Sequence, residues 1–307
     1  MEKLPNVPAF SLRQLLYFVT VAESGTLNEA AARLRISQSG VSLAINELER
    51  ALKVQLCIRR KAHGITLTPA GRQALQQMRA LLRQAEDLES AVSGSGEQLT
   101  GRLSIGCYVT LAPTVLPPLL QEFSALHPAL TLDFEDGTSD RLQRLLLDGE
   151  LDVAVVYDMD VLPDMERVVM FTMPPHVLLP ADHRLANEPV VALRDLVDEP
   201  MVLLDAPPSS RHTLLLCQEA GMAPIVRHRT RNFEMARALV GRGLGWAILV
   251  QRPPNDRTYE GRRVVYKQIA ELPDAAVSVL LCWPKQVAQT RRVAEFVRYC
   301  AEGRATT

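Results

Sequence analysis

Two helical patterns joined by a short turn, close to the start of the chain, constrain its fold more than any other feature. Segment 37–52 predicts a helix, because its apolar residues recur at spacings of four, three and four along one face: Val41, Ile45, Leu48 and Leu52. Upstream, Thr26 and Glu29 form a T-x-x-E capping box that opens a short alanine-rich helix. Two such helices separated by a tight turn predict a helix-turn-helix, whose second helix enters a DNA major groove.

The polar residues around these helix starts have short hydrogen-bonding side chains, which suit base edges and phosphate oxygens in a major groove. We therefore predict DNA contacts from six of them: Thr26, Ser37, Gln38, Ser39, Ser42 and Asn46. Taken alone, segment 37–52 is better explained as an amphipathic helix with a solvated outer face. The elements on either side decide between the two interpretations.

A short apolar segment after the second helix runs into a basic cluster. Residues 54–58 predict a strand, His63-Gly64 predict a turn, and residues 65–67 predict the returning strand. The cations at the tip are Arg59, Arg60 and Lys61, which we predict to contact phosphates. A solvated run of charges is the alternative, but the position straight after a helix-turn-helix favours a β-hairpin wing.

A long helix begins at Thr68-Pro69, where a capping hydroxyl precedes proline at the first helical position. Alternating spacings of three and four, with one charged interruption, indicate a heptad seam: Leu75, Met78, Leu82, Ala85, Glu89 and Val92. A lone helix has no place to bury such a seam, so we expect it to pair with a second copy of the chain. Ser93-Gly94-Ser95-Gly96 then reads as a linker.

Charge is unevenly distributed, which matters because a net charge of −1 is low for a DNA-binding protein. Residues 1–93 hold 12 Lys+Arg and 8 Asp+Glu, whereas the remainder holds 22 and 27. A basic nucleic-acid module attached to an acidic one fits this asymmetry. The sequence has neither an apolar run long enough to span a membrane nor a secretory leader, so we expect a cytoplasmic protein. Five scattered cysteines without C-x-x-C or zinc spacing predict reduced thiols and no metal site.

From Gly101 onward, predicted strands and helices alternate. The first half has βαβαβ order, with strands at 102–107, 130–134 and 151–157 and helices at 112–126 and 139–147. This order predicts a parallel sheet with right-handed crossovers. A second alternating series follows, and the chain ends in one more strand and helix: 201–204, 210–220, 225–230, 233–242, 246–250, 277–283 and 290–300. We therefore expect two similar α/β lobes.

Ligands in open α/β sheets bind beyond the carboxyl ends of strands, where helix N-termini offer free N–H groups and partial positive charge. Polar or cap-like residues occupy four such places: Thr110, Thr138-Ser139, Ser209-Ser210 and Asn232. We predict that they converge on one cleft and bind a small organic effector, with a carboxylate as the favoured class. Arg211 and Arg231 beside the cleft would favour an acid, whereas Asp205 would favour an amine. The two arginines are explained equally well as solvated surface cations. Each polar residue taken singly is explained equally well as a helix cap.

Along its whole length the chain resembles a LysR-type transcriptional regulator. The residues that carry the resemblance are, in order, Phe18-Val19, Ala22–Gly25, Ala30–Leu34, Ser37-Gln38, Val41-Ser42, Ile45, Leu48-Glu49, Leu52, Leu56, Arg59 and Leu67–Gly71. Three positions depart from the family pattern. Ser39-Gly40 replaces a usual Pro-Ala, Leu43 replaces a DNA-contacting arginine, and Cys57 replaces an aromatic residue of the wing. The base-reading code is therefore expected to differ from that of better-known members.

The resemblance implies an N-terminal all-α winged helix-turn-helix with a coiled-coil linker helix, followed by two Rossmann-like α/β lobes arranged as in periplasmic binding proteins. The expected domains are the DNA-binding domain 9–67, the linker and dimerisation helix 68–93, a flexible hinge 94–100, lobe I at 101–163 plus 270–304, and lobe II at 164–269. Chain crossings between the lobes are implied near 163–169 and 266–276. Beside Thr110 and Thr138, the resemblance adds three residues to the predicted effector pocket: Asp205, Pro207 and Phe233.

We interpret the chain as a DNA-binding regulator that responds to an effector and has no catalytic residues, cofactor or metal. An α/β enzyme is one alternative, but G-x-S-x-G, G-x-x-x-x-G-K-[ST] and H-E-x-x-H are all missing from the sequence. A solute-binding protein is another, although it leaves the capping box, wing and seam unexplained. Expected partners are double-stranded DNA with an inverted-repeat promoter site, RNA polymerase, the effector, and further copies of the chain in a homodimer or homotetramer. Effector binding would shift the lobes, and the long helices would change the spacing of the DNA-binding heads.

Overall fold

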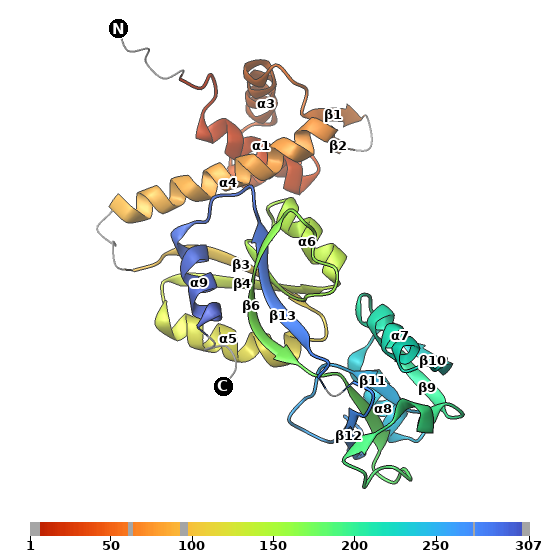
Figure 1. Ribbon diagram of the computed structural model, residues 1–307. Helices are drawn as coiled ribbons and strands as arrows, with labels where there is room; N and C mark the ends of the chain where they lie inside the picture. Colours follow the sequence, from red (N-terminus) through yellow and green to blue (C-terminus); the bar gives the residue numbers. More distant parts are fainter. Residues whose placement is uncertain (1–6, 61–63, 93–97, 273, 303–307) are drawn as a thin grey trace.

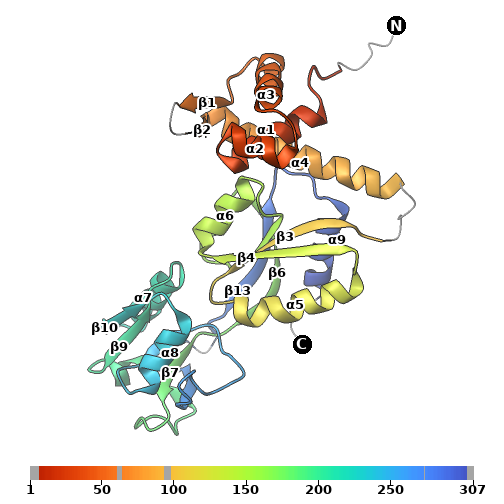
Figure 2. The same ribbon diagram turned by 180° about the vertical axis from the view of Figure 1, so that it is seen from behind.

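The computed structural model of the chain describes residues 7–60, 64–92, 98–272 and 274–302. The fold has three bodies, namely an N-terminal helical domain, lobe I and lobe II, and lobe II is inserted between two segments of lobe I (Figures 1 and 2). The long helix α4 lies between the other N-terminal helices and lobe I in both views. Among the described residues, no helix combines the length and apolarity needed to cross a membrane.

The N-terminal domain is a winged helix-turn-helix followed by one long helix. Its elements are α1 (Leu12–Ser24), α2 (Leu27–Leu34), α3 (Gln38–Leu52), β1 (Cys57–Arg60), β2 (Gly64–Leu67) and α4 (Pro69–Val92). Val41, Ile45 and Leu48 of the predicted stripe are buried, and Leu52 packs at the margin of the same core. The stripe therefore holds α3 against the domain and leaves its polar face outward.

Local caps set the helix boundaries of this domain. The Ser37 hydroxyl accepts a hydrogen bond from the Gly40 N–H at 3.1 Å. The Thr26 hydroxyl accepts from the Glu29 N–H at 3.2 Å, which is the hydroxyl half of the predicted capping box. The full reciprocal pair forms at α1, between Ser11 and Gln14. Helix α1 ends at Gly25, which has φ of 70° in the left-handed region that glycine adopts without strain.

Lobe I is a five-stranded sheet in the order β4-β3-β5-β13-β6, covered by helices on both faces. Its elements are β3 (Gly101–Tyr108), α5 (Ala112–Leu126), β4 (Leu130–Gly137), α6 (Ser139–Leu147), β5 (Val153–Tyr157), β6 (Met165–Met173), β13 (Val277–Pro284) and α9 (Arg291–Ala301). Strand β3 pairs in parallel with both β4 and β5, as the βαβαβ order predicts. The returning strand β13 is antiparallel to β5 and β6.

Lobe II has two groups of strands, β11-β7-β12-β8 and β10-β9. Its elements are β7 (His176–Pro180), β8 (Val190–Val191), the 3₁₀ turn η1 (Leu193–Leu196), β9 (Pro200–Leu204), α7 (Ser209–Glu219), β10 (Ile225–Thr230), α8 (Phe233–Gly241), β11 (Ala247–Leu249) and β12 (Val264–Ile269). The N–H of Val202 donates to the carbonyl of Trp246 at 2.7 Å and joins the two groups beside β11.

The first chain crossing between the lobes differs from the expected position. Strand β6 pairs along its length with β13 in the lobe I sheet, so the boundary follows Met173 instead of residue 163. The sequence pattern could not show which sheet this strand joins, because its partner is more than a hundred residues away in sequence. The second crossing lies between β12 and β13, within the expected range 266–276. The proposed hinge 94–100 falls largely outside the described residues.

Candidate nucleic-acid interface and interlobe cleft

The start of α3 presents a continuous polar surface on the outside of the N-terminal domain. Ser37, Gln38, Ser39 and Asn46 are exposed and Ser42 is half-buried. The Ser37 and Ser39 hydroxyl oxygens lie 3.0 Å apart. Five of the six predicted helix and cap contacts thus lie on one exposed face, and Thr26 is exposed at the cap of α2. Uncharged donors and acceptors in this arrangement suit base edges.

Leu43 also lies on this part of α3 and is 57% exposed. It occupies the position where the resemblance implies an arginine. An exposed leucine contributes neither a phosphate contact nor a hydrogen bond to a base. The predicted DNA contacts on α3 are therefore all neutral polar groups, and the predicted positive charge lies elsewhere.

The wing was predicted to supply that charge. The backbone of Arg59 and Arg60 lies in β1, which pairs antiparallel with β2. The side chains of these two arginines, and Lys61 as a whole, lie outside the described residues. Their contact with phosphates therefore stays a prediction.

The base of the wing is fixed to the helices by backbone hydrogen bonds. A carboxylate oxygen of Glu49 on α3 accepts the N–H groups of Leu56 at 2.7 Å and Cys57 at 2.9 Å. The N–H of Ile65 donates to the Gly25 carbonyl at 2.7 Å. Sequence reasoning missed the anchoring role of Glu49, because a charged residue at a helical position normally indicates a solvated face.

Part of the predicted seam on α4 packs against the N-terminal domain of the same chain. Leu75 and Met78 are buried in the core of the N-terminal domain, and Leu82 packs against that core. The expectation that the helix has no place to bury them is wrong for these residues, because α1 packs alongside α4. Two other α4 leucines, Leu81 and Leu88, are exposed and lie seven residues apart on one face. The side chain of Val92 lies outside the described residues.

A direct bridge crosses between the lobes at the end of β3. The buried Tyr108 hydroxyl of lobe I donates to the carbonyl of Ala206 in lobe II at 2.9 Å and lies 3.2 Å from the Ser209 hydroxyl. A second link is the ion pair of Asp160 with Arg211. The lobes are therefore closed on each other.

Beside this bridge, both lobes line a small cavity. Ten described residues surround it: Thr110, Tyr157, Leu204, Ser209, Thr213, Phe233, Ile248, Leu249, Val250 and Gln251. The enclosed space is about 10 Å³, close to the minimum that holds one water molecule. None of these ten side chains carries a formal charge. Burial raises the pKa of the Tyr157 phenol far above its usual value, so this group stays neutral and hydrogen-bonds with Thr110.

The cavity brings together three of the predicted effector residues, Thr110, Ser209 and Phe233. Three further predicted effector residues have hydrogen-bond or ion-pair partners within their own lobe. Asn232 caps α8 by accepting from the Met235 N–H at 2.8 Å, and Asp205 lies 3.8 Å from Arg229. The Ser139 hydroxyl accepts from Gln143 at 3.0 Å.

The remaining three predicted residues lie near the bridge or at the start of α6 and α7. The Pro207 carbonyl lies 3.3 Å from the Tyr108 hydroxyl, Ser210 is buried in the first turn of α7, and Thr138 precedes α6 with its side chain bonded to Asp140. No finding assigns an effector contact to any of the nine, so these assignments stay predictions.

Gln251 is a cavity residue that sequence reasoning missed. Its side-chain amide donates to the Thr114 hydroxyl, and that hydroxyl donates onward to the Leu111 carbonyl at 3.2 Å. This chain fixes the amide orientation and leaves the oxygen Oε1 buried without a hydrogen-bond partner. The residue is only 5% exposed. A buried acceptor without a partner is costly, and a bound donor would satisfy it. Gln251 directly follows the strand end at Leu249-Val250, which is the signal that could have found it.

The described residues hold no cluster of histidine, cysteine or acidic side chains suited to a metal ion. All five cysteines are buried, and none of them forms a disulfide. Burial raises the pKa of Cys217 to about 11 and the pKa values of Cys282 and Cys300 to about 12.

Comparison with known proteins agrees with this architecture. The family described as "Bacterial regulatory helix-turn-helix protein, lysR family" matches residues 12–72, and the "LysR substrate binding domain" family matches residues 96–305. A Bacillus subtilis relative, the uncharacterized HTH-type transcriptional regulator YvbU, is 30% identical over 78% of this chain and 81% of its own length.

Two solved structures are also similar. The C-terminal domain of a probable LysR family transcriptional regulator from Rhodococcus sp. RHA1 is 48% identical, covering 66% of this chain and 99% of that one, with a TM-score of 0.64. HinK, a LysR family transcriptional regulator from Pseudomonas aeruginosa, is 36% identical, covering 95% of this chain and 98% of its own, with a TM-score of 0.64. The similarity to HinK extends over all three bodies of the fold.

Proposed function

The chain belongs to the LysR family of DNA-binding transcriptional regulators with an effector-binding domain, and from that premise we propose how it selects DNA and what it senses. It binds an inverted-repeat promoter site through the paired heads of a dimer or tetramer. A small organic effector, held between lobes I and II, changes its action on RNA polymerase. The cytoplasm is its site of action.

The observation that carries the DNA proposal is the exposed polar start of α3, held outward by the buried stripe on the opposite face. Gln38, Ser39 and Ser42 supply base-edge contacts, and the basic wing supplies phosphate contacts. The solved structure of full-length CbnR, another LysR family regulator, is a complex with its target DNA. Its likeness to this chain supports the fold, and the surface on α3 supports the same use here.

Selection of bound duplexes from a random-sequence library, followed by gel shifts at increasing KCl, tests this proposal. We expect an inverted repeat to be enriched and its affinity to fall steeply with salt. Gln38→Ala and Ser42→Ala should change which half-site sequence is preferred, whereas Arg59→Ala should weaken binding to all sequences. Ser124→Ala, an exposed serine on α5, is the matched control and should change neither. A library that returns no enriched sequence would contradict the proposal.

The effector proposal rests on the chemistry of the interlobe cavity. Helices α7 and α8 begin at Ser209 and Phe233, so their N-terminal N–H groups and partial positive charge lie at its wall. This favours a carboxylate even though no cation lines the cavity among the described residues. Arg211 is already engaged with Asp160 at the mouth. The side-chain oxygen of Gln251 has no hydrogen-bond partner, so a hydrogen-bond donor on the ligand would satisfy it. The proposed class is therefore a small carboxylate that also bears a hydroxyl or N–H group.

Isothermal titration with pairs of carboxylates, each with and without a hydroxyl or amino group, tests this class. We expect a member with a donor to bind more tightly than its partner without one, by roughly 1–3 kcal/mol for a satisfied buried acceptor. Gln251→Leu should abolish that preference, whereas Gln218→Leu, at an exposed position on α7, should preserve it. Equal binding of both members to the wild-type chain, or an unchanged preference in Gln251→Leu, would overturn the assignment.

A further inference from the structure

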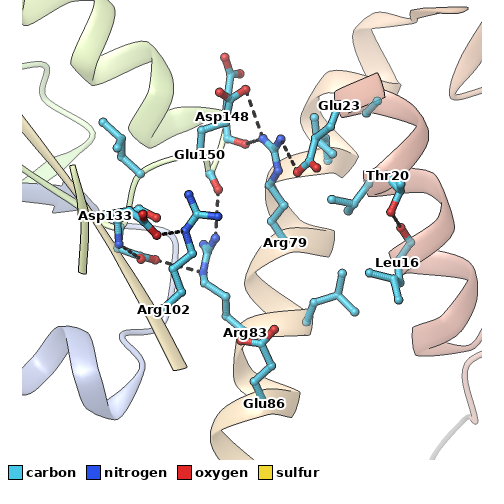
Figure 3. Close-up of a pocket in the computed structure, with 18 of the residues that line it drawn as sticks. Leu16, Thr20, Glu23, Arg79, Arg83, Glu86, Arg102, Asp133, Asp148 and Glu150 are labelled. Atoms are coloured by element: carbon cyan, nitrogen blue, oxygen red, sulfur yellow. Dashed lines mark hydrogen bonds and ion pairs between the residues drawn. The ribbon is translucent and has the colours of Figure 1, made fainter. Parts of the chain in front are cut away.

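A second, larger cleft separates the N-terminal domain from lobe I. It has a volume of about 1210 Å³, and charged side chains line much of it (Figure 3). One wall is α1 and α4, and the other is β3, β4 and the loop 148–152. The apolar cores of the two bodies form separate clusters. Among the residues that the structure describes, no shared apolar core joins the two bodies, so polar contacts are important for holding lobe I against α4.

Arg79 of α4 is the first of these contacts and joins three parts of the molecule. Its side chain is 8% exposed and donates to the backbone carbonyl of Asp148 in lobe I at 2.5 Å. It also donates to the carboxylate of Glu23 in α1 at 3.2 Å and lies 3.6 Å from Glu150 (Figure 3). Glu23 in turn pairs with Arg33 of α2 at 3.1 Å. A continuous polar chain thus runs from the helix-turn-helix to lobe I.

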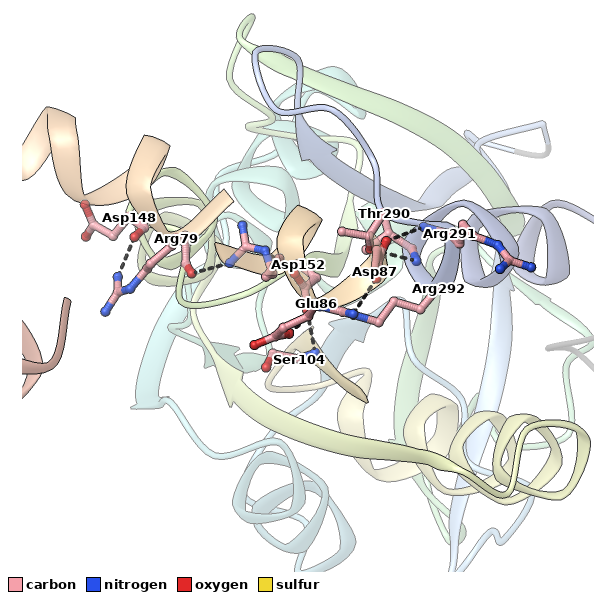
Figure 4. A network of polar contacts seen from close by, with 12 residues as sticks. Arg79, Glu86, Asp87, Ser104, Asp148, Asp152, Thr290, Arg291 and Arg292 are labelled. Atoms are coloured by element: carbon pink, nitrogen blue, oxygen red, sulfur yellow. Dashed lines mark hydrogen bonds and ion pairs between the residues drawn. The ribbon is translucent and has the colours of Figure 1, made fainter. Parts of the chain in front are cut away.

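Arg83 makes the second contact, one helical turn further along α4. Its guanidinium donates to the Gly149 carbonyl at 3.0 Å and lies 3.3 Å from the carboxylate of Asp152. The other oxygen of Asp152 accepts the backbone N–H of Ser104 at 2.9 Å (Figure 4). The carboxylate is therefore fixed to β3, a strand inside the lobe I sheet.

Arg292 makes the third contact in the opposite direction, from α9 of lobe I to α4. Its side chain is 2% exposed and donates to Asp87 at 2.6 Å and Glu86 at 3.3 Å (Figure 4). The second oxygen of Asp87 accepts the backbone N–H of Arg291 at 2.9 Å, at the start of α9. Gly101 makes room for the guanidinium, since a Cβ there would lie 3.0 Å from it.

We propose that Arg79, Arg83 and Arg292 form a latch that fixes the angle between lobe I and the DNA-binding domain of the same chain. A buried ionic contact is favourable only while every partner is in place, so it favours two discrete arrangements, docked and released. The angle of the head sets the bend that the protein imposes on DNA. The inference rests on the proposed regulatory function. Lobe I forms one wall of the proposed effector cavity, and the latch connects lobe I to the DNA-binding domain.

Hydrogen–deuterium exchange of the free full-length chain tests the latch without DNA or effector. Asp87→Asn should raise exchange at the Arg291 amide, and Arg79→Gln should raise it in the loop 148–152, each by about tenfold, because release exposes these segments. Asp87 and Arg79 lie on α4, so neither change alters the core of lobe I. Arg144→Gln removes an exposed guanidinium that pairs with Asp140 on α6, and it is the matched control, which should leave both segments unchanged. Unchanged exchange in the first two variants would overturn the latch.

DNA bending on the duplex selected by the wild-type chain gives the second measurement. Both latch variants should keep the sequence preference of the wild type but alter the bend angle. A wild-type bend in both variants also overturns the latch while the regulator proposal stands. A wild-type chain that selects no sequence contradicts the regulator proposal, and the exchange experiment still decides whether the latch exists.

Discussion

The phenol hydroxyl of Tyr108 in lobe I lies 2.9 Å from the backbone carbonyl oxygen of Ala206 in lobe II, and both residues are buried. This neutral contact and the Asp160–Arg211 ion pair together hold the two lobes closed beside a cavity of about 10 Å³. A molecule larger than water fits between the lobes only when they open. We therefore expect the Tyr108 bridge to contribute to how readily the proposed effector cleft opens.

Tyr108→Phe should loosen the closed arrangement. Loss of one buried hydrogen bond lowers the free energy of unfolding by about 0.5–1.5 kcal/mol, and it should also raise amide exchange in segment 204–210. The matched control is Tyr299→Phe, because the Tyr299 hydroxyl donates to Glu122 at 2.5 Å entirely within lobe I. That variant should lose stability without a change in segment 204–210. Equal exchange of this segment in the two variants would show that Tyr108 does not control closure.

Much of the N-terminal domain could be predicted from the sequence because its determinants are local. The caps at Ser11, Thr26 and Ser37 and the stripe on α3 act within one or two helical turns. The spacing of the α4 seam, in contrast, fits packing against another chain and against α1 equally well. Spacing alone therefore could not show that Leu75 and Met78 are buried within the chain.

The contacts that position the sites join residues far apart in sequence. Tyr108 and Ala206 are 98 positions apart, and Asp87 and Arg292 are 205 apart. No periodic pattern encodes such pairs, because each depends on how the lobes pack. Thr110 and Ser209 were found from the rule that ligands bind at strand ends, whereas Phe233 came from the family resemblance. The same rule applied to β11 would have found Gln251.

Leu88→Glu should weaken association of two copies through α4. Leu88 is 66% exposed and lies on the same face as Leu81, which leaves an apolar stripe for a second α4 to cover. Burial of a leucine contributes roughly 1.5–3 kcal/mol, so the dimer dissociation constant should rise about tenfold or more. Sedimentation equilibrium measures it. Leu126→Glu, at the exposed end of α5, is the control and should leave association unchanged.

Leu43→Arg should strengthen DNA binding. The side chain is exposed beside the polar start of α3, and an arginine there adds one phosphate contact. One further contact should steepen the dependence of log affinity on log salt by about one unit, as measured by gel shifts over a KCl series. Leu126→Arg adds the same charge on lobe I and should leave this slope at its wild-type value. If both variants behave alike, net charge and not position explains the gain.

The cysteines should resist modification in the native chain. All five are buried, and burial raises the pKa of Cys217 to about 11 and of Cys282 to about 12, so the reactive thiolate is scarce at pH 8. Mass spectrometry after iodoacetamide should find labelling only in denatured protein. Rapid labelling or peroxide oxidation of any native cysteine would contradict this expectation.

His176 should make lobe II sensitive to mild acid. Burial, assisted by the nearby charge of Arg252, lowers the pKa of His176 from 6.5 to about 3, and its ring packs edge-on against Tyr266 at 4.9 Å. Below pH 6.5 the unfolded chain binds a proton that the folded chain excludes. The free energy of unfolding should therefore fall by about 1.4 kcal/mol per pH unit from pH 6.5 toward pH 3, with no such loss above pH 6.5.

His176→Phe keeps the ring against Tyr266 and removes the titrating group, which separates the effect of His176 from that of the other acid-sensitive residues. Thermal unfolding of wild type and variant between pH 7.5 and 4.5 measures the difference. The variant removes the buried ring nitrogen Nε2, which has no hydrogen-bond partner, and also the hydrogen bond between the ring and the Pro174 backbone, so its stability at pH 7.5 serves as the reference. Relative to the wild type, the variant should become more stable as the pH falls, because only the wild type gains a proton at position 176 on unfolding. A constant difference across this range would mean that His176 is protonated in the folded chain and that its burial does not govern acid stability.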